Sequence, residues 1–239
     1  MYGWRARIGI LVVASDVTCE SELYRIVPEG VSIHTSRMTF PGAVTPEALE
    51  KLASYAEKAT DLLIPACVDT IAFCCTSGSF IKGAGYDKEI IAKLEGKFPN
   101  VTVTTTSTAV SAAFKKLNIK KVAVATPYLD SVNEALKNYL EAEGISVLNI
   151  EGLGIRDDQE TNNLPLESAY RLSKKVNVPE ADAIFISCTS FRTIEIIEKL
   201  ETDLGKPVIS SNQATIWHAL RQSKVQESIK GYGKLLTLL

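Results

Sequence analysis

The stretch Asp69-Thr-Ile-Ala-Phe-Cys-Cys-Thr-Ser77 decides the fold, because it recurs in the second half of the chain as Asp182-Ala-Ile-Phe-Ile-Ser-Cys-Thr-Ser190. The two copies align without a gap at an offset of 188 − 75 = 113 residues. The same shift carries the apolar run 8–13 onto the apolar run 121–126. An offset that recurs in separate segments predicts a duplicated unit and therefore two similar halves.

A third pair of segments matches at a shorter offset of 208 − 103 = 105 residues: Val103-Thr-Thr-Thr-Ser-Thr-Ala109 and Val208-Ile-Ser-Ser-Asn-Gln-Ala214. Around these repeats, β-branched apolar runs predict buried strands, and segments with helical spacing lie between several of them. The predicted strands are 8–13, 71–75, 101–105, 121–126, 145–150, 183–188 and 208–210, and the predicted helices are 46–63, 86–97, 108–117, 131–143, 166–176 and 193–204.

Strands that alternate with helices are typical of parallel sheets. We therefore expect an α/β fold of two lobes related by a pseudo-twofold axis, each lobe a parallel sheet flanked by helices. The first lobe runs to about residue 117 and the second runs from 118 to 212, with no glycine- and proline-rich linker at the border. The active site is expected in the cleft between the lobes.

Composition narrows the classes of function. A chain of 239 residues with a formal net charge of -2 and no cluster of Lys and Arg lacks the basic footprint of a nucleic-acid binder. No apolar stretch reaches the roughly 18 residues of a membrane span, so we expect no membrane association and a cytoplasmic location. The five cysteines include no Cys-x-x-Cys pair, so we expect free thiols and no metal site. A small molecule is the expected partner.

Cys75 and Cys188 each end a predicted strand, and each is followed by Thr and Ser. Ligands of parallel sheets bind beyond the carboxyl ends of the strands, where hydroxyls such as that of Thr189 and free backbone N–H groups can hold an anion. If the halves face each other, the two thiols reach one cleft from opposite sides. One thiolate can then remove a proton from a carbon while the other thiol delivers a proton to the opposite face.

This chemistry requires a lowered pKa in at least one of the two cysteines, which a helix N-terminus can supply. In the alternative chemistry, a cis-trans isomerisation, the Cys75 thiolate adds to an alkene carbon and a single bond rotates before elimination. The same residues serve both reactions. The other three cysteines, Cys19, Cys67 and Cys74, are interpreted as structural, because free cysteine commonly behaves as a small buried hydrophobe.

Over nearly its whole length the sequence resembles the maleate isomerase and arylmalonate decarboxylase branch of the aspartate/glutamate racemase superfamily. The resemblance implies an isomerase without a cofactor, a C-terminal segment 213–239 that packs on the first lobe, and a possible homodimer or homotetramer. It is carried by Ser36-Arg37, Thr45-Pro46-Glu47 and the segments 75–80, 107–110, 122–128, 132–134, 187–188 and 231–233.

The resemblance also implies roles for single residues. Cys188 matches the cysteine that serves the superfamily as proton donor or acid/base. Cys75 falls where racemases and maleate isomerases have their other cysteine and arylmalonate decarboxylases have glycine, which argues against decarboxylation. Thr76, Ser77 and Tyr128 match residues that hold one substrate carboxylate and stabilise the enediolate formed from it.

The chain departs from the maleate isomerase pattern at two positions. Asp16 and Asp158 stand where those enzymes use asparagines to hold the second carboxylate of the substrate. Because carboxylates repel another carboxylate but accept hydrogen bonds from N–H groups, we expect a substrate with one carboxylate and one amine, amide or ureide nitrogen. The alternative is that both aspartates are solvated loop residues.

Three classes of function follow from these residues. The first is a two-cysteine racemase or cis-trans isomerase of a small carboxylate. The second is an arylmalonate-type decarboxylase that uses Cys188 alone. The third is a non-catalytic protein that binds a small carboxylate.

Overall fold

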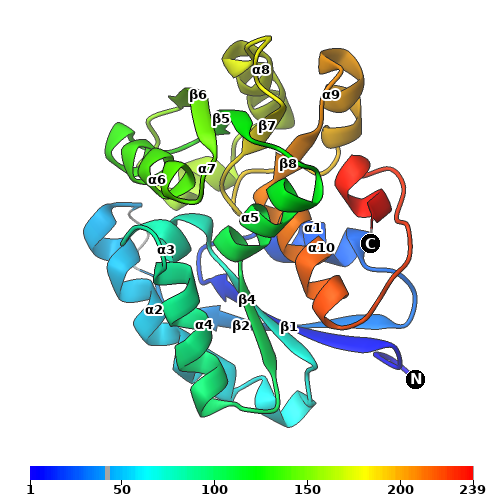
Figure 1. Ribbon diagram of the computed structural model, residues 1–239. Coiled ribbons are helices and arrows are strands. Elements are labelled where there is room, and N and C mark those ends of the chain that lie inside the picture. Colours follow the sequence, from blue (N-terminus) through cyan, green and yellow to red (C-terminus); the bar gives the residue numbers. More distant parts are fainter. Residues whose placement is uncertain (41–43, 239) are drawn as a thin grey trace.

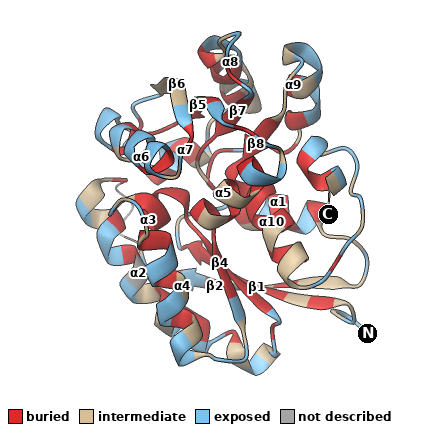
Figure 2. Ribbon diagram, viewed as in Figure 1, coloured by how far each residue is buried: buried red, intermediate tan, exposed pale blue. Residues whose placement is uncertain are grey.

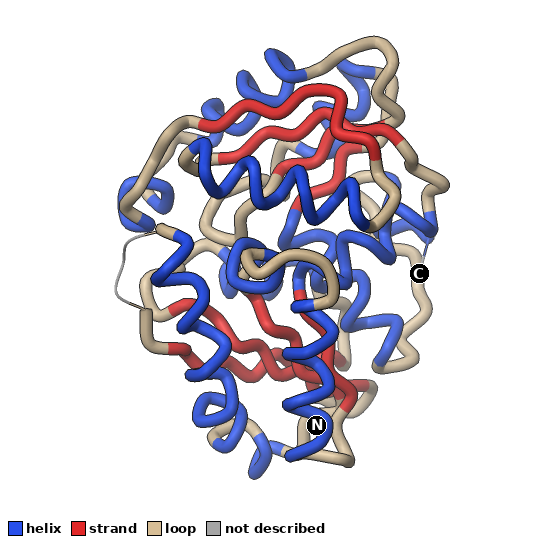
Figure 3. The backbone as a smooth tube through the Cα atoms, turned by 60° about the vertical axis from the view of Figure 1, so that its left-hand side comes forward, coloured by secondary structure: helices blue, strands red, loops and turns tan. Residues whose placement is uncertain are grey.

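The computed structural model describes residues 1–40 and 44–238, and it contains two four-stranded sheets in which every strand pair is parallel. The strand orders are β2-β1-β3-β4 and β6-β5-β7-β8, so the second sheet repeats the order of the first. Figures 1 and 3 show the sheets in separate lobes with helices and loops between them. The strands are β1 Ala6–Val13, β2 Val31–Met38, β3 Thr70–Cys74, β4 Thr102–Thr105, β5 Lys121–Thr126, β6 Ser146–Gly152, β7 Ala183–Ile186 and β8 Val208–Ser210.

Helices cover both sheets, and their outer faces are exposed while the strands are largely buried (Figure 2). The predicted α/β fold with two parallel sheets is confirmed. None of the helices in the described ranges is both long and apolar enough to cross a membrane. The helices are α1 Cys19–Ile26, α2 Pro46–Asp61, α3 Thr76–Phe80, α4 Tyr86–Lys97, α5 Thr106–Lys116, α6 Asp130–Ala142, α7 Asp158–Asn162, α8 Leu166–Val176, α9 Ile197–Leu204 and α10 Ser211–Gln222, with short 3₁₀ turns at Ile64–Ala66 and Lys234–Leu238.

Several elements differ from the sequence prediction, which included none of the short helices α1, α3 and α7. The edge strand β2 was not predicted, because it pairs only with β1 and its half-exposed sequence Val-Ser-Ile-His-Thr-Ser-Arg-Met lacks a continuous apolar run. Helix α10 was not predicted either, although most of its residues are buried. Helix α9 begins at Ile197 rather than at residue 193, because the chain before it forms turns.

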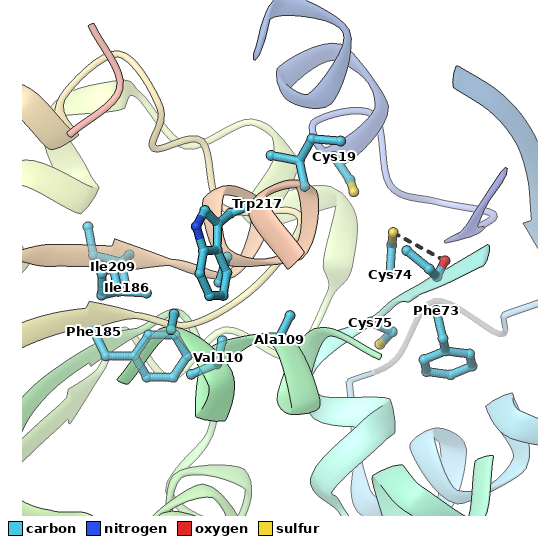
Figure 4. Packing of buried hydrophobic residues seen from close by; sticks show 14 of the residues in the cluster. Cys19, Phe73, Cys74, Cys75, Ala109, Val110, Phe185, Ile186, Ile209 and Trp217 are labelled. Atoms are coloured by element: carbon cyan, nitrogen blue, oxygen red, sulfur yellow. Dashed lines mark hydrogen bonds between the residues drawn. The ribbon is translucent and has the colours of Figure 1, made fainter. Parts of the chain in front are cut away.

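Helices α5 and α10 pack against each other, and each also contacts the sheet of the other half. From α10, His218 Nδ1 lies 2.8 Å from Thr104 Oγ1 of β4 in the first sheet. From α5, the Phe114 ring meets the Phe185 ring of β7 edge-on, with centroids 5.6 Å apart. Figure 4 shows Val110 of α5 beside Phe185, and Trp217 of α10 in the same cluster. Because each of these two helices packs on the sheet of the other half, the strand ends of the two lobes lie around one shared region.

The packing of α10 on β3 and β4 supports the division of the chain into residues 1–117 plus 213–239 and residues 118–212, which we retain as a proposal. Residues 41–43 and 239 of the first lobe lie outside the described residues.

Candidate active site

One pocket is built from the carboxyl ends of strands in both halves. Cys75 directly follows β3, and Cys188 comes two residues after the end of β7. The free volume between the walls is about 20 Å³, which is room for a single water-sized group, so the walls must move apart to admit a larger acid. The pocket is lined by Val13, Phe40, Val44, Leu49, Cys75, Thr76, Ser77, Tyr128, Asp158, Cys188, Thr189 and Ser190.

The pocket therefore brings together every residue that the sequence predicted for the site except Asp16. Asp16 lies buried next to it, close enough for the charge of Asp158 to raise its pKa and for its own charge to raise the pKa values of both cysteines. Cys74 points away from the pocket, on the opposite side of β3 from Cys75 and toward Cys19 (Figure 4). Cys19 and Cys74 are both fully buried, as expected for structural cysteines, whereas Cys67 is exposed and does not fit that interpretation.

Cys75 caps the N-terminus of α3. Its sulfur accepts a hydrogen bond from the backbone N–H of Gly78 at 3.4 Å and lies 3.8 Å from Ser77 Oγ. The helix begins here because Cys75 has an extended backbone while the next five residues are helical. A thiol at this position points its sulfur at the free amides of the first turn.

Cys188 has a φ of 140°, in a region that L-amino acids rarely adopt. Such a backbone costs about 1–3 kcal/mol and persists only where the surroundings hold it. The Cys188 N–H donates to Ser211 Oγ at 3.0 Å, and that hydroxyl also accepts a hydrogen bond from Thr76 Oγ1 at 2.8 Å. Ser211, the first residue of α10, thus connects the two cysteine segments.

The expectation that one thiol has a lowered pKa is wrong for this state of the protein. Burial raises the pKa of Cys75 to about 12, against the hydrogen bonds from Gly78 and Ser77. The pKa of Cys188 is raised well above its usual value, first by burial and then by the negative charges of Asp158 and Asp16. The hydrogen bonds at the start of α3 do not outweigh the effect of burial on Cys75, and burial and the two aspartates raise the pKa of Cys188. The two cysteines are therefore thiols at neutral pH.

Tyr128 presents a hydroxyl in the same pocket. The side chain is buried, and burial raises its pKa well above the ordinary value, so the hydroxyl keeps its proton and can donate it to an anion. The Ser187 hydroxyl donates to the Tyr128 oxygen at 3.4 Å, and the ring of Phe80 packs edge-on at 6.4 Å. Both contacts orient the phenol.

The two aspartates form an acidic wall without a cation. Asp16 Oδ1 accepts hydrogen bonds from the N–H groups of Thr18 and Cys19, each at 2.8 Å, whereas Oδ2 has no partner within hydrogen-bond distance among the described residues. The Thr189 hydroxyl lies near enough to lower the pKa of this carboxyl. Burial raises the pKa of Asp16 to about 6. Asp158 Oδ2 accepts from Ser15 Oγ at 2.5 Å, and burial raises its pKa as well. Across residues 1–40 and 44–238, neither carboxylate belongs to a salt bridge.

The described part of the chain contains no group of three or more His, Cys, Asp or Glu side chains arranged to hold a metal ion. What the pocket does contain is two thiols, neighbouring hydroxyls and the Asp158 carboxylate, with the Asp16 carboxylate buried beside it. A set of this kind can bind a carboxylate, add sulfur to a carbon and transfer protons.

A sequence model of the arylmalonate decarboxylase family matches residues 8–236, nearly the whole chain. The chain belongs to the arylmalonate decarboxylase family. It is 29% identical over 197 residues to the arylmalonate decarboxylase of Bordetella bronchiseptica, covering 81% of this chain and 82% of that protein. It is also 26% identical over 239 residues to the maleate isomerase of Nocardia farcinica, covering 96% of this chain and 95% of that protein.

Solved structures agree with this placement. A cysteine-to-serine variant of the Nocardia farcinica maleate cis-trans isomerase, with a covalently bound succinylcysteine intermediate, matches with a TM-score of 0.92 at 25% identity, over 97% of this chain and 98% of that one. A maleate isomerase from Pseudomonas putida S16 with maleate matches with a TM-score of 0.92 at 26% identity, over 97% of each chain. The predicted branch of the superfamily is confirmed.

Sequence reasoning missed two residues of this family member that hold the site together, Ser211 and Asn212. Asn212 Nδ2 donates to the carbonyl oxygen of Thr189 at 2.9 Å, and in the first half Ser107 Oγ donates to the carbonyl oxygen of Thr76 at 3.3 Å. The 105-residue offset aligns Ser107 with Asn212, so the repeat carried the signal. It was interpreted only as evidence of duplication.

Gly152 lies against the backbone of Tyr128 and gives a testable prediction about the pocket wall. A Cβ at this position would come within 2.3 Å of the Tyr128 carbonyl oxygen and 2.4 Å of Asn133 Nδ2. Gly152→Ala is therefore expected to lower the free energy of unfolding by about 2 kcal/mol, since backbone cannot yield as a flexible side chain does. Urea unfolding measures this change.

Gly96→Ala is the matched control, because Gly96 lies in α4 and a methyl group added there would meet nothing within 4 Å. Alanine in an open helix position is expected to leave stability unchanged or to raise it by up to about 1 kcal/mol. Equal changes in the free energy of unfolding for Gly152→Ala and Gly96→Ala would contradict the close approach of Gly152 to the backbone of Tyr128.

Proposed function

We propose that this chain is a cysteine-based isomerase of a small carboxylic acid that works without a cofactor. The observation that carries the proposal is that Cys75 and Cys188, at equivalent strand ends of the two halves, line one pocket. The maleate cis-trans isomerase with a covalently bound succinylcysteine supports it, because this family member uses a cysteine that bonds to its substrate.

In the proposed reaction, the Thr76, Ser77 and Tyr128 hydroxyls hold one carboxylate of the substrate. The Thr76 hydroxyl, which donates to Ser211 Oγ in this structure, turns toward the carboxylate when it binds. Cys75 loses its proton, and Asp158 is an ionisable acceptor lining the same pocket. The Cys75 sulfur bonds to one alkene carbon, and the π electrons move onto the neighbouring carbon and its carboxylate as an enediolate. Rotation about the new single bond, return of the electrons and cleavage of the C–S bond release the isomer and the Cys75 thiolate.

In this scheme Cys188 serves as the acid/base on the opposite face: it protonates the carbon next to the new C–S bond and takes that proton back before the bond breaks. Thr189 adds a hydroxyl beside it. A racemisation uses the same two sulfurs without a C–S bond: one thiolate takes the proton from the carbon, and the other thiol supplies one. The raised pKa values of both cysteines mean that the thiolate forms only when substrate binding or a proton acceptor compensates the cost of charge in the buried pocket.

Asp16 and Asp158 are proposed to face the end of the substrate away from the held carboxylate. The buried Asp16 Oδ2 lacks a donor among the described residues, and an N–H-bearing group on the substrate would supply one. A second carboxylate would instead meet two negative charges. We therefore propose a substrate with one carboxylate and one amine, amide or ureide nitrogen rather than maleate.

Turnover of a substrate panel in deuterium oxide tests the function. Proton NMR of maleate, amino acids, N-acyl amino acids and hydantoins follows deuterium uptake at carbon. With a chiral shift reagent added for the chiral substrates, it also follows the appearance of the other isomer. We expect isomerisation of a nitrogen-bearing acid that exceeds that of maleate. Tight binding of a panel member with no deuterium uptake and no isomer would instead identify a binding protein.

A decarboxylase is the second candidate, because the family model and the Bordetella bronchiseptica relative carry that name. The isomerase is favoured by the presence of Cys75 in the pocket, since decarboxylation needs Cys188 alone. Cys75→Gly separates the two. A decarboxylase keeps or improves turnover of a disubstituted malonate after this substitution, whereas an isomerase loses isomerisation.

We also propose a cytoplasmic protein that acts on a free small molecule rather than on nucleic acid or a membrane. We propose a homodimer or homotetramer as its form in solution. The balanced charge supports the choice of a small-molecule partner. Light scattering after gel filtration distinguishes a monomer of 26.0 kDa from a dimer or tetramer.

A further inference from the structure

The two cysteine segments are held in different ways, although their sequences repeat. After β3, the chain enters helix α3, whose first turn is capped by the Cys75 sulfur. After β7, residues 187–196 form bends and turns instead, and they carry the strained backbone of Cys188. Because buried N–H groups need acceptors, the second segment requires partners that α3 does not need.

Glu22 of α1 supplies these partners from the other lobe. Its side chain is 3% exposed, and its Oε1 accepts hydrogen bonds from the N–H groups of Thr193 at 2.5 Å and Ile194 at 3.1 Å. Its Oε2 accepts from Asn212 Nδ2 at 2.7 Å and from Thr193 Oγ1 at 3.4 Å. One carboxyl group thus accepts hydrogen bonds from three backbone or amide N–H groups, while burial raises its pKa to about 7 against these bonds.

Asn212 extends the contact toward the active site. The same amide nitrogen that donates to Glu22 also donates to the carbonyl oxygen of Thr189 at 2.9 Å, one residue beyond Cys188. The Cys188 segment is therefore held at Cys188 by Ser211, at Thr189 by Asn212, and at its far end by Glu22. Of these holders, only Glu22 comes from the N-terminal half.

We propose that Glu22 is a positioning residue that holds the Cys188 segment, through Thr193, Ile194 and Asn212, in the strained conformation that directs the Cys188 sulfur into the pocket. Glu22 does not line the pocket, so it acts through the segment and not on the substrate. The positioning role of Glu22 in catalysis rests on the proposed function. The hydrogen bonds that hold the segment do not depend on that function, and their effect can be measured without turnover.

Iodoacetamide alkylation of the two pocket cysteines tests the proposal. In Glu22→Gln, one carboxylate oxygen becomes an NH₂ group that faces another donor, so the segment opens more often. The rate of Cys188 alkylation is expected to rise by about tenfold relative to that of Cys75, since Cys75 is held by α3. Mass spectrometry of the peptides containing each cysteine gives the ratio of the two rates in one sample.

Glu20→Gln is the matched control, because Glu20 lies in the same helix but bonds to Thr35 and Arg37 of its own lobe. It is expected to leave the ratio at the wild-type value. Asn212→Ser is the second variant, in case Glu22→Gln does not fold. It keeps the Glu22 bonds to Thr193 and Ile194 but removes the amide between Glu22 and Thr189, and it is expected to raise the same ratio.

A Cys188-to-Cys75 ratio that stays within about threefold of the wild-type value in folded Glu22→Gln, or in folded Asn212→Ser if the former does not fold, overturns the proposal. A parallel rise for both cysteines leaves the ratio unchanged and overturns it as well, because it indicates general loosening. If the ratio rises as expected but no substrate of the panel turns over, the proposed function fails while the hold of Glu22 on the segment stands.

Discussion

Cys75→Ala and Cys188→Ala are each expected to lower the turnover number by about a thousandfold or more, and the double variant to lower it little further. Removal of a nucleophile or of an essential acid/base eliminates the step that it performs, and groups that act as one unit have non-additive effects. Isomer formation followed by NMR, on the best substrate of the panel, measures all three variants.

Cys67→Ala is the control for these variants, because Cys67 is an exposed thiol that does not line the pocket. It is expected to turn over at the wild-type rate. Full isomerisation by Cys75→Ala would refute the two-cysteine mechanism and leave a reaction that depends on Cys188 alone. Activity retained by both single variants would show that neither sulfur is essential.

Asp16→Asn is expected to stabilise the protein above pH 6 by about 3 kcal/mol relative to the wild type. Burial raises the pKa of Asp16 from 3.8 to about 6, so between these values the folded state binds more protons than the unfolded state. The protonated Asp16 carboxyl therefore makes its full contribution to stability below pH 3.8, the pKa of the unfolded state. This contribution is lost as the pH rises through the folded-state pKa of about 6. Asparagine is neutral at every pH and keeps an oxygen that can accept from Thr18 and Cys19.

Urea unfolding of both proteins from pH 3.5 to 8 measures the difference in stability. The two curves should meet near the acid end, separate as the pH rises from 3.8 to about 6, and stay a constant distance apart above that. Asp182→Asn is a control of opposite sign, because hydrogen bonds from the N–H groups of Lys120 and Lys121 lower the pKa of Asp182. That substitution should cost stability at neutral pH. Parallel pH curves for wild type and Asp16→Asn would show that Asp16 is not the buried acid inferred here.

The same substitution reports on the substrate. If Asp16 accepts a hydrogen bond from an N–H group of the ligand, Asp16→Asn is expected to weaken the binding of the nitrogen-bearing acid. The same substitution is expected to improve the binding of maleate, because it removes one of the two negative charges at this end of the site. A protein that gains stability and loses discrimination together would show that the buried charge is retained for binding.

Several features of this protein were determined by the sequence alone. The duplication, the strand ends that carry Cys75 and Cys188, and the parallel sheets are all written in local runs and in a fixed offset, so they need no knowledge of long-range contacts. Even Ser211 and Asn212, which hydrogen-bond to the Cys188 segment, lie in a repeat that is visible in the sequence. Local patterns suffice here because strand periodicity and helix spacing are properties of neighbouring residues.

Only the tertiary structure decided the electrostatics and the hold on Cys188. A helix N-terminus predicts a lowered thiol pKa, but burial among residues from both halves reverses its direction. Glu22 reaches Thr193 across 171 positions of sequence, and no local pattern marks that pair. Burial and hydrogen bonding depend on every segment that packs around a group, and that sum exists only after the chain has folded.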